Sequence, residues 1–113
     1  MTSETTPKSL RTIPREKAFY FFTSIGNYTG LSASSLKDFL EKINQVNIKS
    51  LEFHLNRGDF EKWLNEVLED KKLAEQLGRL QRSNLSGDIL RSQLYEIVSR
   101  HYKELTTRAA FSM

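Results

Sequence analysis

Hydrophobic residues recur at three- and four-residue spacing over most of the chain, which is typical of amphipathic helices. The clearest such stripe consists of Leu36, Phe39, Leu40, Ile43 and Val46. Ser35 stands before it and Asp38 follows three residues later, a spacing that resembles a capping box. The pattern therefore predicts a helix that begins after Ser35 and buries one face.

Three further stripes follow in the second half of the chain. They consist of Phe60, Trp63, Leu64, Val67 and Leu68, then Leu73, Leu77 and Leu80, then Leu90, Leu94, Ile97 and Leu105 with Val98 at the edge. Gly58 is placed to end the element before the first stripe, and Asp59 and Asp70 are placed to cap the first two helices. The last helix is expected from near Ser86 to about Leu105. Gly78 weakens the middle helix by about 1 kcal/mol relative to alanine.

The segment before Gly58 fits two patterns. Leu51, Phe53 and Leu55 alternate with polar residues as in a half-buried strand, while Ile48, Leu51 and Leu55 fit a helix capped by Asn47. We favour the helix, because helical patterns flank the segment and a single internal strand has no obvious partner.

An aromatic run, Ala18-Phe19-Tyr20-Phe21-Phe22-Thr23, opens the ordered part of the chain. Its β preference favours a short strand over the alternative, a buried helical turn. Ser24 to Gly30 is rich in turn-forming residues, and residues 31–33 can pair back to complete a hairpin over residues 18–33. Such a hairpin is marginal alone and needs helices to pack on.

These elements predict a mainly α fold, a small bundle of about five helices with a short N-terminal β-hairpin. Residues 1–17 contain both prolines and few apolar residues, so we expect a flexible arm. Residues 18–105 then form a single helical domain, and residues 106–113 a frayed tail. A length of 113 residues suits one domain with one core.

Composition and charge narrow the class of protein. The chain has no cysteine, which excludes disulfides and thiolate metal sites. Its N-terminus lacks the apolar region of a signal peptide, so we expect a cytoplasmic protein. The net charge is +3. Residues 1–30 contain 4 basic (Lys, Arg) and 2 acidic (Asp, Glu) residues, residues 31–70 contain 5 and 8, and residues 71–113 contain 8 and 4. This uneven distribution of charge could steer a charged partner toward one part of the surface.

The residues best suited to bind a ligand lie next to Gly58, where the predicted helix ends. In a helical segment, His54 and Arg57 project from neighbouring faces, so an anion could be held between imidazole and guanidinium. The alternative is structural: Asp59 caps a helix, Arg57 pairs with an acid, Trp63 fills the core and His54 closes its rim. General rules for charged and capping residues favour this second interpretation.

The sequence contains little that indicates catalysis or metal binding. His54 and His101 lie in different predicted helices with no ligand at metal-binding spacing, and His101 falls within an apolar stripe. The chain has no nucleophile motif and no phosphate-binding glycine loop. We therefore expect a protein that is not an enzyme, with no cofactor and no metal.

Nucleic-acid binding is the competing class of function. Lys72, Arg79 and Arg82 could form a basic ridge on one helix. Arg91 and Arg100, however, are nine residues apart and point to opposite sides of the last helix. The positive charge is thus scattered, whereas a phosphate-binding protein generally has a continuous basic face.

The order of sequence motifs along the chain is similar to that of a known protein family. The aromatic strand and Ile25–Gly30 turn precede Ser35-Leu36-x-x-Phe39-Leu40 and then Ser50-Leu51-x-x-His54-x-x-Arg57-x-Asp59-Phe60-x-x-Trp63-Leu64. Over roughly residues 18–105 this resembles a small prokaryotic family of unknown function, found as stand-alone archaeal proteins and as accessory segments of larger sugar- and phosphate-metabolising enzymes. The resemblance implies a domain that assists or regulates a partner, and it brings no catalytic residue.

We accordingly expect a non-catalytic binding or accessory domain. Its partner is another protein or a small anionic ligand, and nucleic acid is the alternative. Tyr28, His54 and Arg57 form the expected contact surface, whereas Asp59 and Trp63 are assigned structural roles.

Overall fold

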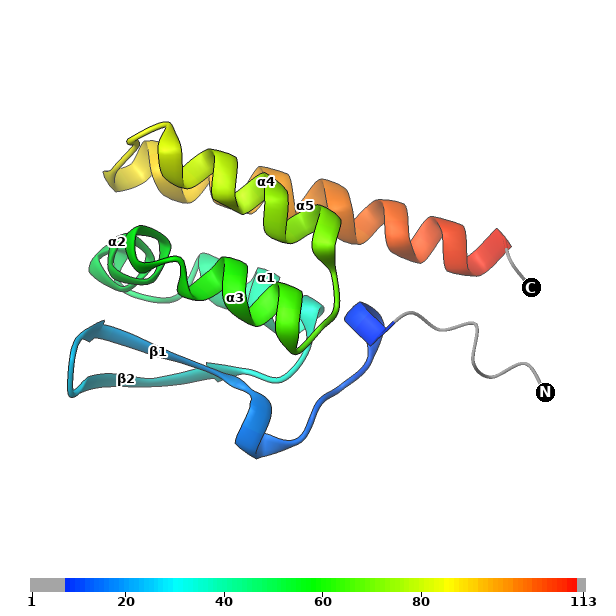
Figure 1. Cartoon of the computed structure of the whole chain (residues 1–113), viewed down its shortest axis with the longest axis horizontal. Helices are drawn as coiled ribbons and strands as arrows, with labels where there is room; N and C mark the ends of the chain where they lie inside the picture. Colours follow the sequence, from blue (N-terminus) through cyan, green and yellow to red (C-terminus); the bar gives the residue numbers. More distant parts are fainter. Residues whose placement is uncertain (1–7, 112–113) are drawn as a thin grey trace.

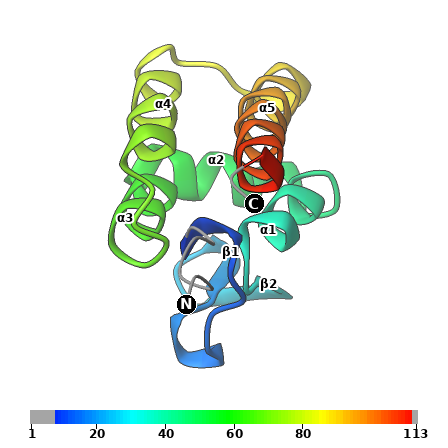
Figure 2. The same cartoon turned by 90° about the vertical axis from the view of Figure 1, so that its right-hand side faces the viewer.

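The computed structural model describes residues 8–111, which fold into three layers (Figure 1). A β-hairpin forms one outer layer, and α4 (Lys71–Arg82) and α5 (Gly87–Phe111) form the other. Three shorter helices lie between them: α1 (Leu36–Ile43), α2 (Ile48–Arg57) and α3 (Asp59–Glu66). Helix α2 runs crosswise to the two long helices, and it packs on β1, α3, α4 and α5 (Figure 2). The five helices and the hairpin confirm the predicted fold class.

The hairpin joins β1 (Phe19–Ser24) to β2 (Asn27–Ala33) in antiparallel register, from Phe19 opposite Ala33 to Ser24 opposite Asn27. Its turn consists only of Ile25 and Gly26, so it is tighter than the expected Ser24–Gly30 loop. Gly26 has a φ of 80°, a conformation that glycine adopts without strain. Alternation along β1 buries Phe19 and Phe21 against the helices and leaves Tyr20 on the outer face.

The residues that the sequence predicts as N-caps make cap hydrogen bonds at three helices, α1, α2 and α4. The Ser35 hydroxyl accepts a hydrogen bond from the Asp38 amide at 3.1 Å, and the Asn47 side chain accepts one from the Lys49 amide at 2.8 Å. Asp70 likewise accepts a hydrogen bond from the Leu73 amide at 3.1 Å. These contacts satisfy backbone donors that a helix leaves unpaired at its start. The helical interpretation of residues 50–56 is confirmed, because they lie within α2.

Gly58 is the junction between α2 and α3. Its φ of 77° is left-handed, and its amide donates to the carbonyls of His54 and Leu55, which ends α2 as predicted. Helix α3 then begins at Asp59, and its N-cap position is occupied by Gly58, which makes no side-chain cap hydrogen bond. The prediction that Asp59 caps this helix is therefore wrong.

The core is one cluster of buried residues from the hairpin and all five helices, and aromatic rings form the part next to the hairpin. Phe19 packs on five neighbouring rings, with its centroid 4.9 Å from that of Phe21 and 5.0 Å from that of Phe60. The stripe of α5 is formed by Leu90, Leu94 and Val98, which are fully buried, while Ile97 and Leu105 are only partly buried. Val98 is thus central on α5, not at the edge as expected.

Both ends of the described chain are more ordered than the sequence indicates. Residues 8–17 were expected to belong to a flexible arm, yet Ile13 is buried and its amide donates to the Ser34 carbonyl at 2.8 Å. The Trp63 indole N–H donates to the Lys17 carbonyl at 2.8 Å. At the other end α5 continues to Phe111, where a frayed tail was expected from residue 106. The rest of the expected arm and tail, residues 1–7 and 112–113, lies outside the described residues.

Candidate functional site

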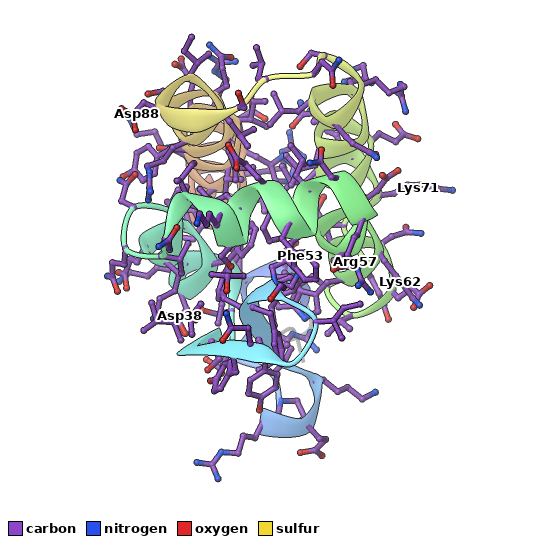
Figure 3. The ribbon with its side chains drawn as sticks, turned by 90° about the vertical axis from the view of Figure 1, so that its left-hand side faces the viewer. Asp38, Phe53, Arg57, Lys62, Lys71 and Asp88 are labelled. Carbon is purple, nitrogen blue, oxygen red and sulfur yellow. The ribbon has the colours of Figure 1, made fainter. Side chains whose placement is uncertain are left out.

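A pocket of about 340 Å³ lies between β1, the hairpin turn and the C-terminal half of α2. Phe53 and Arg57 project from α2 toward the hairpin (Figure 3). Aromatic side chains make up most of its apolar wall, and charged groups gather at the end near the α2–α3 junction. The lining residues are Phe19, Tyr20, Phe22, Ser24, Ile25, Gly26, Phe53, His54, Arg57 and Asp59.

His54 forms the polar wall of this pocket and is held by both ring nitrogens. Its Nε2 accepts a hydrogen bond from the Phe22 amide at 2.8 Å. Since Nε2 is an acceptor, the ring proton is on Nδ1, which donates to Asp59 Oδ2 at 2.8 Å. The imidazole therefore joins β1, α2 and the start of α3, and neither nitrogen is open to a ligand.

The environment of His54 favours the neutral imidazole. Burial lowers the pKa of His54 below its ordinary value, an effect that exceeds the opposing hydrogen bond and charge of Asp59. The nearby Arg57 guanidinium lowers it further. A neutral ring is also what the Phe22 amide requires, because an imidazolium has no lone pair to accept that hydrogen bond.

Asp59 takes the position in which the sequence placed a bound anion. Its Oδ2 accepts from His54 Nδ1 and lies 3.2 Å from Arg57 Nε. The imidazole and the guanidinium thus do converge on one carboxylate, but that carboxylate belongs to the protein. Asp59 does not cap α3, because Gly58 occupies the N-cap position and the Asp59 carboxylate bonds the His54 ring.

Arg57 is the charged group of the site that remains accessible. Its side chain is 49% exposed, and its guanidinium carbon lies 5.0 Å from the centroid of the Phe53 ring. Asp59 engages only Nε, and no other residue within 8–111 accepts a hydrogen bond from the two terminal nitrogens. The guanidinium can therefore offer those N–H groups to an anion at the pocket rim.

The remaining predicted site residues lie apart from the pocket. Tyr28, 46% exposed, lies on the outer face of the hairpin, with its ring centroid 5.9 Å from that of Tyr20 and 5.3 Å from that of Phe22. Trp63 is buried in the core. The structure thus brings His54 and Arg57 together and leaves Tyr28 next to the pocket wall.

The predicted basic ridge lies on the far side of the molecule, on α4. Lys72, Arg79 and Arg82 are exposed, and Lys72 Nζ lies 3.7 Å from Glu104 on α5. Within residues 8–111 no group of three or more His, Asp and Glu side chains is arranged to hold a metal ion.

Sequence reasoning missed the aromatic half of the pocket. Phe53 precedes Arg57 by four residues, a spacing that places the two side chains together on a helix and could have indicated the cation–π contact. The Phe22 amide and the turn residue Ile25 had no such signal, because their position over α2 depends on how the hairpin docks.

Fold and site together define a small, mainly helical domain whose N-terminal hairpin closes an apolar pocket with a basic rim. The chain belongs to the DUF5752 family, a family of unknown function, whose model matches residues 2–97. Comparisons with curated proteins and with solved structures gave no match. None of the helices within residues 8–111 has the length and apolar character needed to cross a membrane.

Proposed function

We propose that this protein is a non-catalytic binding domain that accepts, in the pocket between β1 and α2, a segment of a partner protein carrying a large apolar side chain beside a carboxylate. The observation that carries the proposal is the position of Arg57 at the rim of an aromatic pocket. Its terminal N–H groups donate no hydrogen bond within residues 8–111.

The apolar part of the pocket supports burial of a side chain. Phe19, Phe22 and Phe53 supply aromatic surface, and a volume of about 340 Å³ is at the lower end of the range for ligand pockets. Filling it with one large apolar side chain removes surface from water and contributes roughly 1.5–3 kcal/mol. A carboxylate adjacent to that side chain can then bond the Arg57 guanidinium in two parallel contacts.

The surface around the pocket favours a protein over a small ligand. Ile25, 83% exposed, lines the pocket at the hairpin tip, and Tyr28 extends the apolar surface beyond the pocket next to Tyr20. A small molecule inside the pocket would leave Tyr28 in water. Tyrosine, arginine and exposed apolar residues around one pocket are typical of protein interfaces. An accessory role beside a larger partner is consistent with this chemistry.

A peptide-display selection tests the proposal. Short random peptides would be selected against the immobilised full chain, and we expect the bound peptides to share an acidic residue next to a large apolar one. Removing a charge-assisted hydrogen bond should weaken binding of a selected peptide about tenfold in Arg57→Gln. Phe53→Ala should weaken it comparably by removing apolar contact.

Lys62→Gln is the matched control, because Lys62 is an exposed cation on the neighbouring helix α3 (Figure 3). It removes the same charge without changing the pocket, so peptide affinity should be retained. Peptides that bind Arg57→Gln as tightly as the unmodified chain would contradict the proposal. Selected sequences rich in lysine and arginine would do so as well.

A further inference from the structure

A basic pocket lies along the C-terminal half of α5, in the layer of the molecule opposite the hairpin (Figure 1). Its volume is about 570 Å³, and most of its lining side chains are cations. One lining residue comes from the start of α4 and the others from α5. They are Lys72, Arg100, Lys103, Glu104, Thr107 and Arg108.

Helix packing, and not sequence order, gathers these cations. Arg100, Lys103 and Arg108 follow one another at spacings of three and five residues, which keeps them near one face of a helix. Helix α4 runs beside α5 and adds Lys72 to that face (Figure 2). The sequence instead placed Lys72 on a ridge of α4 alone. The basic surface is therefore shared by two helices, which a pattern within one helix does not reveal.

The acidic residues of this region are already paired within the protein. Glu104 lies 3.7 Å from Lys72 Nζ, and Glu96 lies 2.6 Å from a terminal nitrogen of Arg100. Lys103 and Arg108 are exposed, and neither makes an ion pair within residues 8–111. The pocket thus keeps an excess of positive charge, which an anionic ligand would complement.

A second pocket, of about 360 Å³, adjoins the first and shares Arg100 and Lys103 with it. It continues along α5 toward Ser92. We call the two pockets together the α5 groove. From Ser92 to Arg108 the groove follows 16 residues of helix, or about 24 Å at the usual rise of 1.5 Å per residue. This length suits an extended ligand better than a small molecule.

The other side chains of the α5 groove are polar or aromatic. Hydroxyl groups beside arginine and lysine are the donors that proteins use toward phosphate oxygens, and here they belong to Ser92, Ser99 and Thr107. Tyr95 is 36% exposed and offers a ring face on which a base can stack. Among the described residues, neither pocket is lined by Leu, Ile, Val, Phe or Trp. A lipid surface would require such side chains on the same face.

We propose that the α5 groove binds the phosphate backbone of a single-stranded nucleic acid. The cations bind successive phosphates, and Tyr95 stacks on an unpaired base, which a duplex does not offer. The α5 groove shares no lining residue with the pocket between β1 and α2. Loss of peptide binding therefore leaves this proposal intact, and the reverse also holds.

Fluorescence anisotropy of a labelled oligodeoxythymidylate of about 16 nucleotides, titrated with the full chain, tests the proposal. Four cations that each neutralise one phosphate should give a slope of about −3 when the logarithm of the affinity is plotted against that of the salt concentration. In the double variant Lys103→Gln, Arg108→Gln the slope should fall to about half, and binding at about 0.1 M salt should weaken roughly 10- to 30-fold.

The double variant Lys49→Gln, Lys62→Gln is the matched control. Both lysines are exposed, on α2 and α3, and neither lines the α5 groove. It removes the same net charge, so oligonucleotide affinity and salt slope should stay close to those of the unmodified chain. Equal weakening in the two double variants would overturn the proposal, because it would show that net charge alone attracts the oligonucleotide.

Tyr95→Ala tests the stacking contact. We expect about fivefold weaker oligonucleotide binding with an unchanged salt slope, since no charge is removed. Poly-glutamate of similar length should bind more weakly than the oligonucleotide. Poly-glutamate binding of equal strength would contradict recognition of a nucleic acid. Binding to phosphatidylserine vesicles without binding to the oligonucleotide at low salt would overturn the proposal in favour of a lipid surface.

Discussion

At the scale of single residues, His54 holds together three parts of the protein. One ring nitrogen accepts from the β1 backbone at Phe22 and the other donates to Asp59 at the start of α3, while the side chain itself belongs to α2. Because these two hydrogen bonds require opposite roles, only one neutral tautomer satisfies both. The proton state of one imidazole therefore determines whether the hairpin stays attached at this point.

Acidification should weaken the fold through His54. The pKa of His54 is lowered in the folded state, chiefly by burial and against the opposing effect of Asp59, so the unfolded chain binds the proton more readily. The stabilisation is fully present above the ordinary value of about 6.5 and is lost as the pH falls through the folded-state pKa. Urea unfolding between about pH 8 and pH 5 should show this loss.

The control for this experiment is His54→Gln, which shares every other titrating group. The difference in free energy of unfolding between the unmodified chain and the variant should shrink as the pH falls. A difference that stays constant over the same range would show that His54 does not titrate below its ordinary value. The Phe22 amide should shift in NMR spectra over the same pH range.

The sequence indicates His54 as a special residue but not what it does. A histidine beside an arginine and an aspartate is compatible with an anion site or with a structural role. Which of these two roles His54 has depends on its hydrogen bond with the backbone amide of Phe22, 32 positions away in the sequence. No local pattern predicts that contact, because it arises from the docking of the hairpin on α2.

At the scale of elements, Gly78 lies at the contact between α3 and α4. Gly78 lies in the middle of α4, and a Cβ added there would lie 2.8 Å from the Glu61 Oε2 atom of α3. The sequence indicates only the helix-propensity cost of this glycine. Its place opposite α3 becomes apparent only when the two helices are packed.

Gly78→Ala should stabilise the protein by up to about 1 kcal/mol, because alanine has the higher helix propensity. The atoms that the new methyl group meets are the carboxylate of Glu61, which can rotate away. The gain should be larger in a Glu61→Ala background, where that carboxylate is absent. Chemical denaturation of the single and double variants measures both effects. A loss of stability in both backgrounds would show instead that the helix backbones cannot accommodate a methyl group.

At the scale of the whole molecule, residues 8–17 are part of the domain. Ile13 is buried, its amide bonds the Ser34 carbonyl, and the Lys17 carbonyl accepts from Trp63. Composition suggested a flexible arm, since prolines and charged residues surround a single isoleucine. Hydrophobic periodicity identifies the α-helices well because it is local, but a single buried apolar residue, Ile13, between two short 3-10 helices gives no period to detect.

Ile13→Ala should lower the free energy of unfolding by about 2–5 kcal/mol, the usual cost of deleting a buried isoleucine side chain. Thr12→Ala is the matched control, because Thr12 is exposed beside it. We expect its effect to stay within about 0.5 kcal/mol. Trp63 fluorescence during urea unfolding provides the measurement. Equal stability of the two variants would contradict the packing of this segment.

The most direct test of the central claim is an NMR titration of the isotope-labelled full chain with N-acetylphenylalanine, which combines an aromatic ring with a carboxylate. We expect shifts confined to the amides of residues 20–26 and 53–59, weaker shifts with the uncharged N-acetylphenylalanine amide, and weaker shifts in Arg57→Gln. Shifts that are equal for the acid and its amide would contradict recognition of a carboxylate by Arg57. Shifts centred on α4 and α5 would contradict the pocket itself.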